Sequence, residues 1–258
     1  MFAINRKIMI LSSLLSFNLL LACSSQPSGA GDKPTSESSA ATVTPFSPKS
    51  TVTPAETEGG IVSQFSKSTL SDSISLDTIS DTPSIRAETD LVDGKILMIS
   101  GDREERGHLI APSVLGAEGD QTFQSNYKIV YRKGNNDKVL LELPAFLYLQ
   151  PTDKILPFDK VSFKEADIFL LTPQYRTGHG LEAYVFAVDK QNGDVFPIEI
   201  RKGEKTSKTL LYAELGKKPF NQNGQLVVYP PIGAGTPEKD TKEIHYKLDL
   251  RNKQFIAD

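Results

Sequence analysis

The sequence predicts a mainly-β protein, an antiparallel sandwich or open barrel of about eight or nine strands that follows a disordered tether. Short apolar or alternating runs are separated by Asn, Gly and Asp, which is the pattern of strands joined by turns. Ten prolines interrupt the chain beyond residue 110. Since no stretch past residue 90 keeps a helical apolar period for three turns, long helices have little room.

Three strand–turn–strand units stand out, at residues 127–143, 183–200 and 244–256. Each has an alternating or apolar run on both sides of a polar turn. Similar spacing of the turns leaves two alternatives open, a repeat of hairpins as in a partial propeller, or turns that align by chance. Further strands are expected within the apolar runs 95–100, 166–171, 209–213 and 225–229.

The segment that precedes this region is harder to assign. Residues 61–90 mix Ser, Asp and Thr with a few Leu and Ile side chains. That composition fits either an edge strand or a continuation of the tether, so the segment is transitional. The β-rich globular domain is predicted to cover residues 91–258.

The N-terminus has the composition of an export signal. Arg6 and Lys7 precede an uncharged stretch, residues 8–22, that is rich in Leu and Ile. As a helix this stretch would span roughly 22 Å, short of a ~30 Å hydrocarbon core. Residues 1–22 are therefore predicted to be a signal peptide, and Cys23 follows directly as the only Cys of the chain.

The junction Leu20-Leu21-Ala22-Cys23 resembles the lipobox of bacterial lipoprotein precursors. The resemblance implies that the leader is cut after Ala22 and that the Cys23 thiol carries fatty acyl chains such as palmitate. Ser24 and Ser25 follow without an Asp, which implies the outer membrane of a Gram-negative cell or the outer face of a Gram-positive plasma membrane. An ordinary secretory signal with a chance Cys is the alternative.

A linker is predicted between the lipid and the body. Ser, Thr, Pro, Gly and Ala supply 27 of the 37 residues from 24 to 60. Such a segment buries too little apolar surface to offset its ordering entropy, so residues 23–60 are expected to form a disordered linker on the lipidated Cys. A flexible chain of this length has an r.m.s. span of roughly 35 Å.

Charge and Cys content exclude several classes. The chain has 29 basic and 32 acidic side chains, so no overall charge favours nucleic acid as a partner. Removal of residues 1–22, which carry two basic side chains, leaves the mature chain more acidic, so the acyl chains must provide the anchoring. One Cys excludes an intramolecular disulfide and a Cys-cluster zinc site.

Two polar segments are candidates for a site. Residues 101–108 combine carboxylates, arginines and a His, and we expect a solvated loop in which Arg103 and Arg106 pair with the carboxylates. The loop 175–182 is the stronger candidate for ligand binding or recognition. Its candidate residues are Tyr175, Arg176, His179 and Glu182. The sequence assigns no catalytic residue, metal ligand or cofactor.

These observations predict a lipid-anchored cell-envelope lipoprotein with a β-rich, non-catalytic binding or structural module. Its partners would be the membrane, through the N-terminal lipid, and an envelope protein or cell-wall component, with no nucleic acid. The alternative is an envelope hydrolase or metal-dependent enzyme that uses the loops 101–108 and 175–182. That alternative requires His108, His179 and a carboxylate to meet in one cleft.

Overall fold

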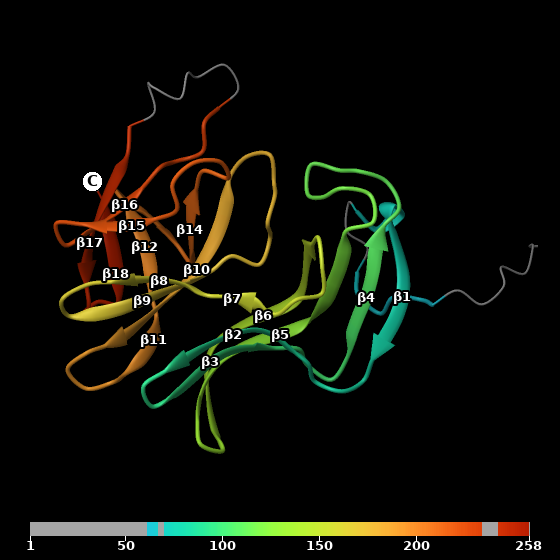
Figure 1. Ribbon diagram of the computed structural model, residues 1–258, viewed down its shortest axis with the longest axis horizontal. Helices are drawn as coiled ribbons and strands as arrows, with labels where there is room; N and C mark the ends of the chain where they lie inside the picture. The colour runs from blue at the N-terminus through green and yellow to red at the C-terminus, as the bar shows by residue number, and fades with distance from the viewer. Residues whose placement is uncertain (1–60, 67–69, 234–241, 258) are drawn as a thin grey trace, which may run out of the picture. The chain divides into compact units, whose positions relative to one another are not determined.

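A computed structural model describes residues 61–66, 70–233 and 242–257 of the chain (Figure 1). Within these residues eighteen strands form three sheets, and the only helical element is the 3-10 turn η1 (Ser71–Ser73). The predicted mainly-β class is confirmed. The strand number exceeds the predicted one because charged segments such as β4 (Glu104–Leu109) and very short segments such as β7 (Leu156–Pro157) also pair as strands. No helix in the described part is long and apolar enough to span a membrane.

The first sheet has seven strands and is strongly curled (Figure 1). In spatial order it contains β1 (Ile74–Ser80), β4 (Glu104–Leu109), β5 (Gln121–Lys133), β3 (Gly94–Ile99), β2 (Ile85–Leu91) and β7 (Leu156–Pro157), with β6 (Asn136–Gln150) beside β5. Strand β5 lies inside the sheet and pairs with β3, β4 and β6. One edge of β5 pairs with β4 over residues 121–125 and with β3 over residues 128–132, and the other edge pairs with β6. The sheet therefore bends where β4 replaces β3.

The second sheet has five strands and the third has six. The five-stranded sheet contains β11 (Val195–Pro197), β10 (Leu181–Asp189), β9 (Ala166–Leu171) and β8 (Asp159–Ser162), with β14 (Thr209–Tyr212) beside β10. The six-stranded sheet contains β13 (Lys205–Ser207), β12 (Glu199–Lys202), β18 (Gln254–Ala257), β17 (Ile244–Asp249), β16 (Gln225–Val228) and β15 (Phe220–Gln222). Pairing is antiparallel except between β12 and β18 and between β2 and β7.

Two hydrophobic cores lie on opposite faces of the five-stranded sheet. Ile168 of β9 and Val185 of β10 pack into the core shared with the six-stranded sheet. Phe169 and Phe186, their neighbours along the same strands, pack into the core shared with the seven-stranded sheet. Burial of both faces explains why β9 is a continuous apolar run with no polar alternation beyond Asp167.

The three predicted hairpins are present as β5–β6, β10–β11 and β17–β18. Each belongs to a different sheet. Their loops contain two, five and four residues, and the second strand varies from the fifteen residues of β6 to the three of β11. These differences argue against a structural repeat. Upstream, the transitional segment contains the edge strand β1 and most of β2, whereas the predicted signal, Cys23 and linker lie outside the described residues.

Candidate functional site

The polar segment 101–108 is not a solvated loop, and that prediction is wrong. Residues 104–109 form β4, which pairs with β1 on one side and β5 on the other. Glu104 and Glu105 are both buried. Strand formation is possible here because the neighbouring arginines pair with these carboxylates, Arg106 with Glu104 and Arg103 with Glu105, as the sequence predicted.

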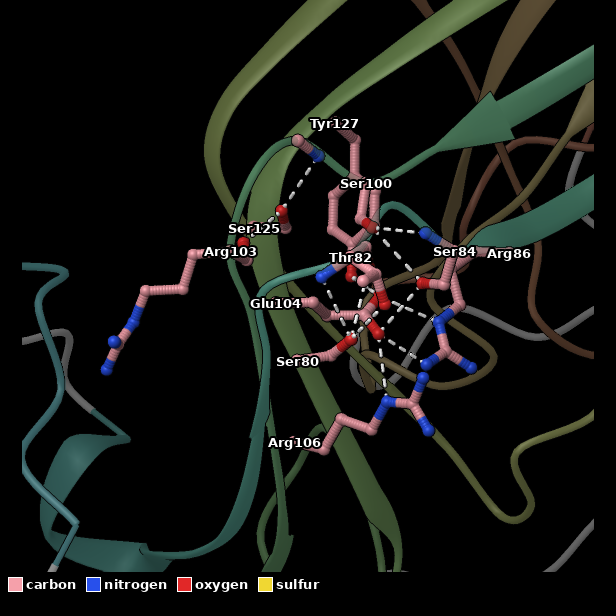
Figure 2. A network of polar contacts seen from close by, with 11 residues as sticks. Ser80, Thr82, Ser84, Arg86, Ser100, Arg103, Glu104, Arg106, Ser125 and Tyr127 are labelled. Carbon is pink, nitrogen blue, oxygen red and sulfur yellow. Dashed lines mark hydrogen bonds and ion pairs between the residues drawn. The ribbon is translucent and has the colours of Figure 1, made fainter.

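Glu104 is the centre of a buried polar network (Figure 2). Its Oε1 accepts hydrogen bonds from Arg86 Nε at 2.7 Å and from the Tyr127 hydroxyl at 2.9 Å. Its Oε2 accepts from Ser84 Oγ and Arg106 Nε, each at 2.9 Å, and from Arg86 Nη2. The carboxylate is thus fully engaged by donors that come from β2, β4, β5 and the turn before β2.

The surroundings of Glu104 hold it in its ionised form. Burial alone would raise the pKa of this carboxyl, but the hydrogen bonds and charge of Arg86, with the donors Arg106 and Tyr127, lower it to about 2. Burial and the nearby carboxylate raise the pKa of the Tyr127 hydroxyl. Arg86 also lies over the Phe123 ring, 4.4 Å from its centroid. Because all of these donors come from the protein itself, the ionised carboxylate links β2, β4 and β5 and stabilises the fold.

Glu105 points to the opposite face of the same sheet and holds the segment 61–66. Its Oε1 accepts from Arg103 Nε at 3.0 Å and from the Gln64 backbone N–H at 2.9 Å. Arg103 Nη2 also donates to the Val62 carbonyl at 3.3 Å. Together, Arg103 and Glu105 tie the first described residues of the chain to β4.

The four residues predicted for the loop 175–182 do not form one site. The Tyr175 hydroxyl donates to Asp120 Oδ2, and the Arg176 carbonyl accepts from Gln174 Nε2 at 2.7 Å. Glu182 lies on β10, where its Oε2 accepts from Thr209 Oγ1 at 2.9 Å. Of the four, His179 lines a surface hollow together with residues from other segments.

That hollow has a volume of about 210 Å³. Its walls are Gly178, His179, Gly180, Ala213, Glu214, Leu215, Pro231 and Ile232. Glu214 fixes the loop, because its Oε2 accepts the backbone N–H groups of Thr177 and Gly178 at 2.9 and 3.0 Å. Gly180 has a φ of +120°, and a Cβ there would lie 2.3 Å from Pro231 Cγ, so glycine is required at this wall.

The rim of this hollow is apolar and open. Leu215 is 84% exposed and Ile232 is 40% exposed. Sequence reasoning missed both residues and Glu214, since their segments pass beside His179 only in the folded chain. The one signal was local, a Leu and an Ile within polar or Pro-rich loops instead of strands. The arrangement can accept an apolar side chain of a partner.

The two candidate histidines have different neighbours. His108 Nδ1 lies 2.9 Å from Asp77 Oδ2 across the β1–β4 pair, whereas His179 borders the hollow. Among residues 61–66, 70–233 and 242–257, no group of three or more His, Cys, Asp or Glu side chains could hold a metal ion. The metal-dependent form of the enzyme alternative therefore has no ligand cluster among these residues.

Comparison with known proteins gives no relative for this arrangement. No family model matches the chain, and neither a curated protein nor a solved structure matches it significantly.

Proposed function

We propose that the protein is a lipid-anchored lipoprotein of the bacterial cell envelope whose β-rich body is a non-catalytic binding or structural module. In a Gram-negative cell it would lie at the outer membrane, and in a Gram-positive cell on the outer face of the plasma membrane. The lipid confines the body to the membrane surface, which raises its effective concentration near other envelope components.

The observation that carries the proposal is the position of the single Cys. Cys23 follows a basic and then uncharged leader, stands at the end of Leu20-Leu21-Ala22, and precedes a Ser/Thr/Pro-rich segment. A thiol is required only at this position if the chain is acylated, and the chain has a thiol only there.

Two features of the body support a binding role. Both oxygens of the buried Glu104 carboxylate accept hydrogen bonds from within the fold, so this network acts structurally and leaves recognition to the surface. The rim of the hollow beside His179 leaves Leu215 and Ile232 in the open, where a partner protein could cover them.

Mass spectrometry of the mature protein tests the anchor. We expect an N-terminus at Cys23 that carries acyl chains, and we expect Cys23→Ser to leave the membrane fraction. Cys23→Ala should behave identically, because neither side chain accepts an acyl chain through sulfur. A mature chain that retains its leader, or an unacylated start, would refute the proposal.

Site-specific photo-crosslinking in intact cells tests the binding role. A crosslinker that replaces His179 should give a discrete adduct with an envelope component. The same crosslinker in place of Lys95, on the seven-stranded sheet, is the control. Identical adduct patterns at both positions, or no adduct at His179, would count against recognition at the hollow.

A further inference from the structure

The segment 61–66 is held against the seven-stranded sheet by its backbone. The Val62 carbonyl accepts a hydrogen bond from Arg103 Nη2 at 3.3 Å, and the Gln64 N–H donates to Glu105 Oε1 at 2.9 Å. The side chains of the segment contribute little, because Val62 is 81% exposed and Phe65 is the one member that is half-buried. Contacts of this kind do not depend on which side chains the segment carries.

The spacing of the two contacts matches an extended polypeptide. Arg103 and Glu105 lie two residues apart on the chain, as do Val62 and Gln64. In an extended chain, the backbone groups of residues two apart point to the same side. Glu105 Oε1 also accepts from Arg103 Nε at 3.0 Å, which fixes the two side chains relative to each other. Figure 2 shows Arg103 extended away from the network around Glu104. We call Arg103 and Glu105 the backbone clamp.

The backbone clamp has an unused acceptor. The Glu105 side chain is 0% exposed, and its Oε2 is buried without a hydrogen-bond partner in the described part of the chain. A buried carboxylate oxygen that lacks a donor is energetically costly. The segment 61–66 contains no charged side chain, so it brings no cation to this carboxylate. The backbone clamp is therefore only partly satisfied by the segment that occupies it.

The surroundings of the backbone clamp favour an occupant with positive charge. A hollow of about 280 Å³ is lined by Phe65, by Ile74 and Leu76 of β1, and by Asp72. Asp72 forms no ion pair with a basic side chain of the described residues. An apolar side chain fits against Ile74 and Leu76, whereas the carboxylates of Asp72 and Glu105 attract a cation.

We infer that the backbone clamp binds an extended segment of a partner polypeptide that carries Lys or Arg, and that the protein's own segment 61–66 occupies this site in its absence. The partner segment offers the same carbonyl and N–H groups and adds the cation that Asp72 and Glu105 lack. Charge complementarity decides the kind of occupant. This site extends the proposed binding role, and neither the lipid anchor nor the hollow beside His179 is needed for it.

Occupation by the segment 61–66 makes the site competitive. A partner binds only to molecules in which the segment has left the backbone clamp, so its apparent affinity is reduced by the fraction of such molecules. Weakening the segment should therefore strengthen the binding of a partner. A surface that is always free would show no such dependence.

Peptides with the sequence of residues 61–66 test the site, because this sequence is the one seen in the backbone clamp. They are capped at both ends, labelled, and titrated against the full chain in detergent, with fluorescence anisotropy as the readout. A basic peptide carries Val62→Lys and Gln64→Lys, and an acidic peptide carries Glu at the same two positions. The basic peptide should bind at least about tenfold more tightly. Methylation of the residue-64 amide nitrogen should weaken the basic peptide at least about tenfold, because the donor to Glu105 is lost.

Variants of the full chain test the competition. Gln64→Pro removes the N–H that Glu105 accepts, so the basic peptide should bind at least about tenfold more tightly than to the wild type. Gln64→Ala keeps this N–H and removes an exposed side chain, so it is the matched control and should behave as the wild type. Glu105→Gln should abolish the preference for the basic over the acidic peptide. If circular dichroism shows that Glu105→Gln does not fold, the comparison of Gln64→Pro with Gln64→Ala still decides.

Hydrogen exchange in the wild-type chain reads the displacement directly. A saturating basic peptide should make exchange at the Gln64 amide at least about threefold faster, because the displaced segment loses its acceptor. The acidic peptide at the same concentration is the control and should leave the rate unchanged. Faster exchange with the basic peptide alone would place it at the backbone clamp and not elsewhere on the protein.

Four results would each overturn the inference. These are equal binding of the basic and acidic peptides, equal binding of the methylated peptide, equal affinities of Gln64→Pro and Gln64→Ala, and unchanged exchange at the Gln64 amide under a saturating basic peptide. Failure of the lipid anchor is read from the mass of the mature protein, and failure of the hollow from crosslinking at His179. The proposals therefore fail in different experiments.

Discussion

The seven-stranded and six-stranded sheets differ in whether their basic side chains form ion pairs. In residues 70–150, seven of the eight basic side chains form ion pairs with carboxylates, and the eighth, Lys138, donates to the Val195 carbonyl. In the six-stranded sheet the four basic side chains Arg201, Lys202, Lys205 and Lys247 form no ion pair with a described carboxylate. The first arrangement stabilises a fold from inside, whereas the second leaves charge available to the outside.

The largest expected loss of stability comes from breaking the buried ion pair between Arg86 and Glu104. Arg86→Ala would leave the buried Glu104 without its bidentate partner, so we expect the free energy of unfolding to fall by about 3–5 kcal/mol. Urea denaturation followed by circular dichroism measures this. Lys247→Ala, at an exposed position of the six-stranded sheet, should change stability by less than about 0.5 kcal/mol. Similar losses for the two variants would abolish the distinction between the sheets.

Acid should weaken the same network. The pKa of Glu104 is about 2 in the folded protein, below its ordinary value of 4.5, because Arg86 and the other donors outweigh the opposing effect of burial. A lowered folded-state pKa means that the stabilisation is complete above pH 4.5 and is lost as the pH falls towards 2. The difference corresponds to about 3 kcal/mol.

Urea midpoints between pH 7 and pH 2.5 check this pH dependence. Glu104→Gln should be less stable at neutral pH and should lack this part of the decline. Lys247→Gln should reproduce the wild-type profile. A Glu104→Gln variant with an unchanged acid decline would show that other carboxylates cause it.

A smaller loss of stability is expected from breaking the contacts between β4 and the segment 61–66. Glu105→Ala removes the acceptor of the Gln64 N–H and the partner of Arg103, and we expect a cost of about 1–3 kcal/mol. Hydrogen exchange at the Gln64 amide should become faster. Glu118→Ala changes the charge equally at an exposed position and is the control. Unaltered exchange at Gln64 in Glu105→Ala would mean that the segment is held by other contacts.

The smallest expected changes in stability should have opposite signs in the six-stranded and seven-stranded sheets. Lys205→Glu replaces a like-charge pair with an opposite-charge pair opposite Lys202, and should stabilise the protein by about 0.2–1 kcal/mol. Arg132→Glu breaks the cross-strand pair with Asp137, whose two contacts are each 2.7 Å, and should destabilise it by a similar amount. Thermal unfolding at low salt measures both. Shifts of the same sign would contradict the view that Lys202 and Lys205 repel each other whereas Arg132 and Asp137 attract.

Much of the fold could be predicted from the sequence. Alternation and Asn, Gly and Asp turns indicate strands directly, so the β class and the hairpins near Gly134, Gly193 and Lys253 were correct. Strand β4 was missed because it consists largely of charged residues, and a pattern of polar residues normally indicates exposure. Glu104 is buried only because Arg86 and Tyr127 reach it from other strands, and those contacts are not local in sequence.

The candidate site was predicted less well for the same reason. Residues of one loop are grouped because they are adjacent in the chain, but the Tyr175 hydroxyl donates a hydrogen bond to Asp120 and Glu182 accepts one from Thr209. The hollow beside His179 is completed by Leu215 and Ile232 from later segments. The neighbours of Arg201 likewise depend on register, since only pairing through Ile256 places Arg201 in one row with Lys247.

The burial of β9 and β10 on both faces has a consequence for how the body comes apart. Ile168 and Phe169 are consecutive residues that belong to different cores, so neither core can be opened without disturbing a strand that lines the other. The outer layers consequently cannot melt independently, and the described body should unfold as one cooperative unit with a single calorimetric transition.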